Sequence, residues 1–121
     1  MLVIKPTLLV DKMLESLLGS ESAEYALIFL VARDEGYATE IARFFRTELF
    51  SIQKQLQKFE YNGILVSRTV GRTRQYSFNP RYTFLDELKA LLEKALSFYP
   101  NDIKEQLLMN RRRPRRQGKP I

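Results

Sequence analysis

The spacing of apolar residues changes abruptly near residue 64, and this change restricts the folds open to the chain. Residues 49–61 carry apolar side chains at helical spacing, with an inward stripe of Ile52, Leu56 and Phe59. Segments 64–70 and 73–78 are instead rich in Val, Thr, Tyr and Phe, with Gly71-Arg72 between them. We therefore expect a helix followed directly by a β-hairpin. Alternation within the second strand points Tyr76 and Phe78 inward and Gln75 and Ser77 outward.

Three helical segments are expected before this unit. Their ranges are 11–18, 23–34 and 38–45, and a connector at 46–48 leads into helix 49–61. Gly19 suits a left-handed C-cap on the first segment, and Ser20 or Ser22 suits the N-cap of the second. The second segment is apolar almost all round, which is typical of a helix buried at the centre of a domain.

This order of elements predicts the fold class. Helix, helix, connector, helix and hairpin is the order of a winged helix-turn-helix. We therefore predict a mainly α protein with a small β-hairpin wing, flanked by N- and C-terminal dimerisation helices. We expect the chain to divide into an N-terminal helical segment (1–19), a DNA-binding core (20–80), C-terminal helices (81–110) and a basic tail (111–121).

The C-terminal helices are expected at 85–98, opened by a loose capping box at 83–86, and at 101–110 with Ile103, Leu107 and Leu108 inward. The first of them carries two apolar stripes. One consists of Phe84, Leu88, Leu91 and Ala95, and the other of Leu85, Leu92, Leu96 and Tyr99. One winged-helix protomer buries one stripe, so the second favours a homodimer, although residues 2–18 offer an alternative cover. The expected dimer contacts are Leu14, Leu17, Leu85, Leu88, Leu92, Leu96 and Tyr99.

The composition excludes most catalytic chemistry. The 121 residues include no His and no Cys, so disulfides, thiolate nucleophiles, imidazole bases and the commonest zinc ligands are all missing. We expect no enzyme activity, no cofactor and no metal site. The longest apolar run, residues 25–32, is far shorter than the roughly 20 residues that a membrane span needs. The expected location is the cytoplasm, without a membrane partner.

The net charge of +6 is unevenly distributed. The tail alone carries +6, through Arg111, Arg112, Arg113, Arg115, Arg116 and Lys119. Residues 41–81 have 8 basic and 2 acidic side chains, whereas residues 1–40 have 3 and 7 and residues 82–110 have 3 and 5. The positive block at 41–81 coincides with helices 38–45 and 49–61 and with the hairpin, which favours contact with double-stranded DNA.

Helix 49–61 is the expected recognition helix. The candidates on its outward face are Leu49, Phe50, Ser51, Gln53, Lys54 and Gln57. Gln53 is the strongest candidate for reading a base, because an amide pairs with adenine. Phe50 suits a thymine methyl, or packing on the preceding helix or on a dimer partner.

The expected phosphate contacts come from the wing and from the basic residues before the recognition helix. In the wing they are Arg68, Arg72, Thr73 and Arg74. Arg43 and Arg46 are further candidates, with surface pairing to Glu40 or Glu48 as the alternative. The five arginines of the tail can add phosphate affinity without reading sequence.

Three runs, at 37–43, 52–56 and 63–66, resemble the ArsR-like winged helix-turn-helix transcriptional regulators. Within that group, residues 76–80 and 84–91 are similar to small winged-helix proteins found alone or fused to nucleotidyltransferase domains. The resemblance implies a dimeric DNA-binding repressor, and it also raises a separate nucleotidyltransferase chain as a partner. The chain departs from the family pattern at Arg46-Thr47-Glu48, where Gly and a small capping residue are usual, and at Leu49-Phe50, where Pro and Ser are common. The Cys and His ligands of metal-sensing relatives are absent.

The hypothesis from the sequence is therefore a dimeric, sequence-specific transcriptional repressor that reads the major groove with helix 49–61 and contacts phosphates or the minor groove with wing 65–78. A non-specific nucleic-acid binder driven by the arginine tail is one alternative. A protein-interaction module that partners a nucleotidyltransferase chain is the other.

Overall fold

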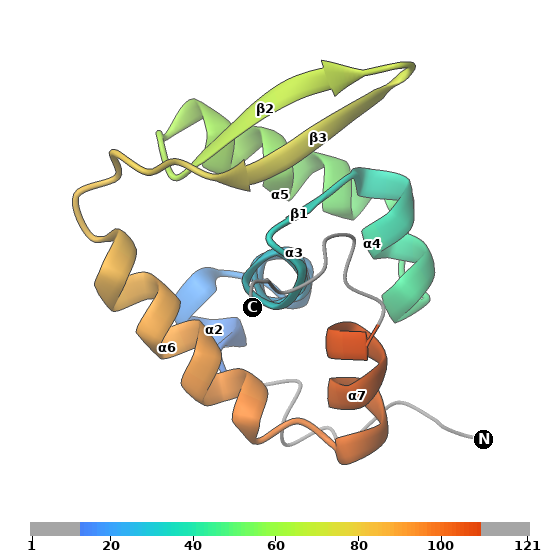
Figure 1. Cartoon of the computed structure of the whole chain (residues 1–121), viewed down its shortest axis with the longest axis vertical. Coiled ribbons are helices and arrows are strands. Elements are labelled where there is room, and N and C mark those ends of the chain that lie inside the picture. The colour runs from blue at the N-terminus through green and yellow to red at the C-terminus, as the bar shows by residue number, and fades with distance from the viewer. Residues whose placement is uncertain (1–12, 110–121) are drawn as a thin grey trace, which may run out of the picture.

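The structure is a computed structural model that describes residues 13–109. Elements carry the labels of Figure 1, and their bounds are α2 Glu15–Leu18, α3 Glu21–Arg33, β1 Glu35–Gly36, α4 Ala38–Phe45, α5 Leu49–Tyr61, β2 Leu65–Val70, β3 Thr73–Phe78, α6 Leu85–Ser97 and α7 Asn101–Met109. The predicted ranges of α4, α5 and β3 agree with these bounds, and that of β2 begins one residue early. The start of the predicted helix 11–18 lies outside the described residues.

Helix α3 forms the centre of the molecule, and the other helices and the hairpin surround it (Figure 1). The hydroxyl of Ser20 accepts a hydrogen bond from the backbone N–H of Ala23 at 3.0 Å, so Ser20 and not Ser22 is the N-cap of α3. Every residue from 23 to 33 is buried. An all-round apolar helix is stable only when it is covered on every side, and α4, α5, α6 and α7 provide that cover.

Helices α4 and α5 form a helix-turn-helix against α3. Ile41 of α4 and Ile52 and Leu56 of α5 are fully buried against the core, as their helical spacing predicted. The ring of Phe45 stacks on that of Tyr25, with centroids 4.2 Å apart. Arg46 ends α4 in the left-handed conformation, at φ 56° and ψ 48°, so an arginine occupies a backbone position that favours glycine.

The sheet has one strand more than the sequence predicted. Strand β1 pairs with β3, which also pairs with β2, and all three strands are antiparallel in the order β1-β3-β2. Gly36 of β1 lies so close to α3 that a Cβ there would come within 2.7 Å of the Phe29 ring. The absence of a side chain at Gly36 thus lets β1 reach β3 across the end of the central helix.

Two expectations for the C-terminal helices are wrong. Helix α6 begins after Phe84, without a side-chain cap, so residues 83–86 do not form the predicted capping box. Leu108 of α7 is exposed rather than inward, whereas Leu107 is fully buried against the core. The bend at residues 98–100 turns α7 back onto α3 (Figure 1).

The apolar stripes of α6 also require a correction. Four residues expected at a dimer surface are buried inside the protomer: Leu14, Leu92, Leu96 and Tyr99. The Tyr99 hydroxyl donates to the Glu24 carboxylate at 2.7 Å, which fixes the end of α6 to the first turns of α3. Leu85 and Leu88 are half-buried, and Leu17 is exposed.

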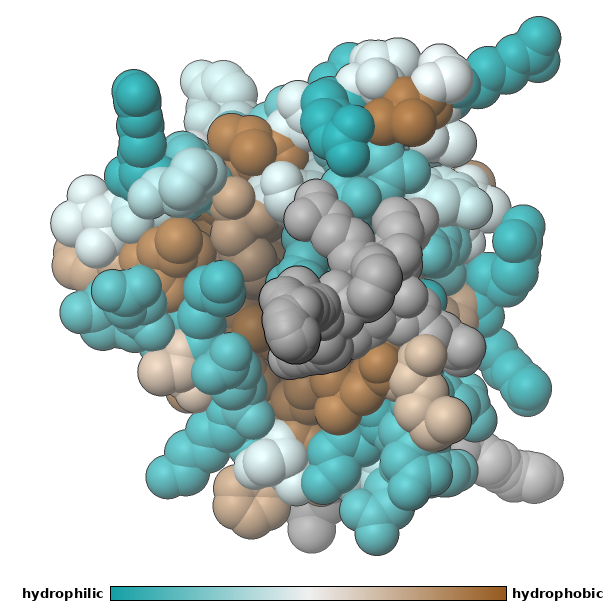
Figure 2. Space-filling model, in the orientation of Figure 1, coloured by the Kyte–Doolittle hydropathy of each residue, from teal (hydrophilic) through white to brown (hydrophobic). Residues whose placement is uncertain are grey.

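A different stripe of α6 faces the solvent. Phe84 and Phe98 are each 60% exposed and Leu91 is 37% exposed, so side chains seven residues apart form an apolar line along the helix. On the face seen in Figure 2, hydrophobic side chains gather over α6 and between α6 and α7, surrounded by hydrophilic ones. Within residues 13–109, no helix combines the length and the apolar character that a membrane span requires.

Candidate nucleic-acid interface

The solvent-facing side of α5 carries the candidates for base contact. Phe50 is 65% exposed, and Leu49, Gln53, Lys54 and Gln57 are exposed as well. The Ser51 hydroxyl donates to the Glu48 carboxylate at 2.9 Å across the first turn, so the hydroxyl proton of Ser51 is already used in a hydrogen bond within the protein. Phe50 and Lys54 lie opposite the buried Ile52, at the centre of the outward face, and Gln53 lies at its edge toward the wing.

A recess lies between α5, the wing and the start of α4. It has a volume of about 280 Å³, and the residues that line it are Tyr37, Ala38, Thr39, Gln53, Gln57, Arg72, Thr73, Arg74 and Tyr76. None of these residues is acidic. The recess therefore combines amide and hydroxyl groups with two guanidinium groups, a set of donors suited to an anionic ligand.

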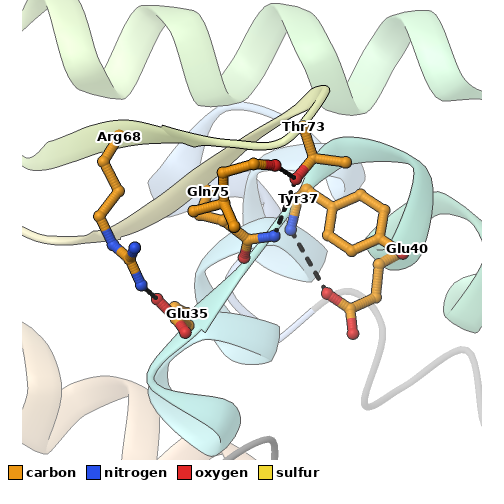
Figure 3. A network of polar contacts seen from close by, with 7 residues as sticks. Glu35, Tyr37, Glu40, Arg68, Thr73 and Gln75 are labelled. Atoms are coloured by element: carbon orange, nitrogen blue, oxygen red, sulfur yellow. Dashed lines mark hydrogen bonds and ion pairs between the residues drawn. The ribbon is translucent and has the colours of Figure 1, made fainter.

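The three wing arginines, expected to act alike, have different partners. Strand alternation places Arg68 and Arg74 on opposite faces of the hairpin, because they pair across it with Gln75 and Thr69 respectively. Arg68 donates to the carboxylate of Glu35 in β1 at 3.0 Å (Figure 3).

Arg74 points toward α5 and joins a second polar cluster. It donates to the Ser67 hydroxyl at 2.8 Å, and that hydroxyl donates to Glu60 of α5 at 2.6 Å. Arg72 at the tip has no ion-pair partner among residues 13–109. The positive charge of the wing is thus least compensated at its tip.

Gln75 does not point outward as alternation predicted. Its side chain is buried, and its amide nitrogen donates to the Thr73 hydroxyl at 3.2 Å (Figure 3). Its amide oxygen has no hydrogen-bond partner in the described part of the chain. Strand β1 pairs with the second edge of β3 and makes β3 the central strand, and Gln75 lies on the sheet face that it shares with Glu35 and Arg68.

Arg43 and Arg46 are exposed, and the acidic residues offered as their alternative partners bind elsewhere. Glu40 forms an ion pair with Arg33 at 3.6 Å, and its other oxygen accepts from the Tyr37 N–H at 3.4 Å. Glu48 accepts from Ser51. Both arginines therefore stay available to an external anion as far as residues 13–109 are concerned.

No family model and no curated protein match the sequence. A double mutant of Lactococcus lactis ZitR, solved in its apo form, matches the structure with a TM-score of 0.50 over 74% of each chain, at 19% sequence identity. The fold is a winged helix. That assignment agrees with the fold class predicted from the order of elements.

Sequence reasoning missed one buried cation. Arg33, at the end of α3, lies between the rings of Phe29 and Phe44, at 4.7 and 5.3 Å from their centroids. Its nitrogens donate to the backbone carbonyls of Leu107 and Gln106 in α7, each at 3.1 Å. Together with the Glu40 pair, these contacts connect α7 to the helix-turn-helix through one side chain.

Burial also changes the acidity of one residue that lines the recess. It raises the pKa of the Tyr76 hydroxyl above its usual value of 10.0, the negative charge of Glu60 raises it further, and Arg74 opposes both. Tyr76 therefore stays protonated at neutral pH, so it adds no negative charge to the lining of the recess.

The tail arginines, from Arg111 to Arg116, lie outside the described residues. Within residues 13–109, no cluster of three or more acidic side chains is arranged to hold a metal ion.

Proposed function

We propose that the protein is a sequence-specific DNA-binding transcriptional regulator, acting as a dimeric repressor. The observation that supports this most strongly is the basic surface formed by the outward face of α5, the recess beside it and the tip of the wing, where Arg72 has no ion-pair partner among residues 13–109. Among the residues that line the recess there is no carboxylate to repel a phosphate. The winged-helix fold places a helix and a hairpin side by side in the arrangement that binds duplex DNA.

In this proposal α5 enters the major groove, and the side chains at the centre of its outward face read the bases. Lys54 is a donor matched to the acceptors of guanine, and Phe50 offers an apolar contact to a thymine methyl. The exposed cations of α4 and the wing bind phosphates, which positions the helix in the groove without reading sequence. Arg43, Arg46 and Arg72 supply these charges.

The dimer is proposed to form through the exposed stripe of α6 (Phe84, Leu91 and Phe98), together with Leu17 of α2. An isologous contact through this stripe presents two α5 helices to the two halves of one site. In this proposal residues 20–80 are the DNA-binding core, and the terminal helices form the dimer contact. The tail of residues 111–121 adds affinity for phosphates.

Random-site DNA selection tests the proposal. It is performed at two salt concentrations, on the full chain and on a chain that lacks residues 111–121. We expect both proteins to select the same roughly palindromic sequence, with lower affinity for the shortened chain. Lys54→Ala is expected to change the selected sequence, because it removes a base contact.

Two other outcomes favour the alternatives. Loss of all binding on deletion of the tail identifies a non-specific binder in which the tail dominates. No binding at low salt, with a stable complex to a nucleotidyltransferase chain, identifies a protein-interaction module.

A further inference from the structure

We propose that the recess between α5 and the wing binds one phosphodiester of the DNA backbone, and that Gln53 contacts this phosphate. The inference depends on the proposed function and adds a ligand group to its binding site. It gives Gln53 a positioning role, in place of the base-reading role that its residue type suggested.

The first step of the argument is topological. A helix in the major groove and a wing at the adjoining minor groove lie on either side of the strand that separates the two grooves. That strand has to pass through the space between the two elements. In this protein the space is the recess, which has Gln53 and Gln57 on the α5 side and Arg72 and Arg74 on the wing side.

The second step is chemical. The recess holds about 280 Å³, enough for a phosphate group with its ester oxygens, and its lining provides donors from both walls. Arg74 already donates a hydrogen bond to Ser67 and pairs with Glu60, whereas Arg72 has no ion-pair partner among residues 13–109. Arg72 is therefore the principal charge for a phosphate in the recess, and Gln53 lines the same recess from the α5 side.

The third step concerns the direction of Gln53. Its position on α5 is at the edge of the outward face, about 100° around the helix from Ile52, whereas Phe50 and Lys54 lie opposite Ile52. A side chain at that edge lines the recess rather than the surface directed at the base pairs. Gln53 thus contributes affinity and register, and base discrimination comes from Phe50 and Lys54.

The test is a coupling measurement on a duplex that carries the selected site. One phosphate at a time is replaced by an uncharged methylphosphonate, and the affinity of wild type, Arg72→Gln and Gln53→Ala is measured for each duplex. We expect one phosphate in each half-site at which the replacement weakens wild type about tenfold but weakens either variant less than about twofold. Arg81→Gln removes an exposed arginine outside the recess, and it should keep the wild-type profile.

The result that overturns the inference is additivity, in which every methylphosphonate weakens the variants as much as it weakens wild type. A change in selected base sequence for Gln53→Ala, with an unchanged methylphosphonate profile, overturns it as well. In both cases wild type still binds DNA, so the proposed function stands. Failure of wild type to bind any duplex at low salt instead removes the proposed function and this inference with it.

Discussion

Arg68 in the wing and Glu35 in the short strand after α3 form an ion pair of 3.0 Å that fastens the hairpin to the linker between α3 and α4. Glu35 is almost fully buried, whereas most of Arg68 is exposed. The pair adds a side-chain contact to the backbone pairing of β1 with β3, which already joins the hairpin to the segment before α4. Of the three wing arginines, Arg68 and Arg74 pair with carboxylates of the protein, whereas Arg72 has no ion-pair partner among residues 13–109.

The first prediction compares these two arginines. Arg68→Ala should lower the free energy of unfolding by about 1 kcal/mol, the upper end for a partly exposed pair, and leave the salt dependence of DNA binding unchanged. Arg72→Ala should leave stability unchanged and lower the slope of log affinity against log salt by about 0.9. Urea unfolding and DNA titrations at several salt concentrations measure both. A lower salt slope for Arg68→Ala, at unchanged stability, would show that Arg68 binds DNA instead.

The second prediction concerns Arg33, whose burial between two aromatic rings the sequence did not indicate. Arg33→Met should lower the free energy of unfolding by about 3 kcal/mol, because it removes the ion pair to Glu40 and the hydrogen bonds to two α7 carbonyls. Amide hydrogen exchange should accelerate most in α7. Arg43→Met, at an exposed position of α4, is the matched control and should change stability by less than about 0.5 kcal/mol. Equal losses in the two variants would contradict the structural role of Arg33.

The third prediction follows from the left-handed backbone at Arg46. Arg46→Gly removes a conformational cost of about 1–2 kcal/mol and adds chain entropy to the unfolded state, so stability should rise by about 0.5 kcal/mol. Arg43→Gly, inside α4, should lower it by about 1 kcal/mol. Both variants remove one exposed arginine, so both should lose a similar amount of DNA affinity. Thermal unfolding gives the sign, and a decrease for Arg46→Gly would show that its side chain stabilises the turn.

The fourth prediction is a pH dependence. Because the pKa of Tyr76 is raised on folding, the folded state holds this proton more tightly than the unfolded state does. The resulting stability is complete below pH 10, the unfolded value, and is lost as the pH rises through the folded value. Tyr76→Phe has no proton to lose, so its stability should fall less than that of wild type between pH 9 and strongly alkaline pH.

The control for this pH series is Tyr61→Phe. Tyr61 is 90% exposed, and its replacement should leave the alkaline decline of wild type unchanged. Urea unfolding across the pH series distinguishes the two variants. The same decline in Tyr76→Phe as in wild type would mean that other groups cause it.

The sequence predicts the elements whose signals are local. The helical spacing of Ile41, Ile52 and Leu56 and the turn at Gly71 locate α4, α5 and the wing, because each depends on residues within a few positions. Strand β1 has two residues and no periodicity, and its partner Ser77 in β3 lies far along the chain. The two strands meet because both pack against α3, and this contact leaves no local pattern in the sequence.

The site is less predictable than the fold because charged residues are assigned from the sequence as if they were exposed. Arg68 pairs with Glu35, and Arg33 binds α7, so both arginines have partners from distant segments. A charge sum taken from the sequence therefore includes cations that are already paired in the fold. The two stripes of α6 pose the same difficulty for apolar residues. Both stripes are hydrophobic, and the position of α3 determines which of them is buried.

The fifth prediction concerns the dimer. Phe84, Leu91 and Phe98 stand seven residues apart along the exposed side of α6, the repeat that places side chains on one seam of paired helices. A carboxylate in this seam would face its own copy across a two-fold axis, so Leu91→Glu should convert the dimer to a monomer in sedimentation velocity. Its affinity for the full palindromic site should fall, while binding to a single half-site remains.

The matched control for that change is Glu93→Lys, which alters a charge on the opposite side of the same helix and should leave the dimer intact. Circular dichroism on both variants checks that α6 still folds. If Leu91→Glu and wild type sediment alike as dimers, the contact lies elsewhere, and Leu17 of α2 becomes the next position to change. If wild type sediments as a monomer without DNA and binds one half-site per protomer independently, the exposed stripe of α6 is not a dimer surface, and the two-fold arrangement on DNA is wrong.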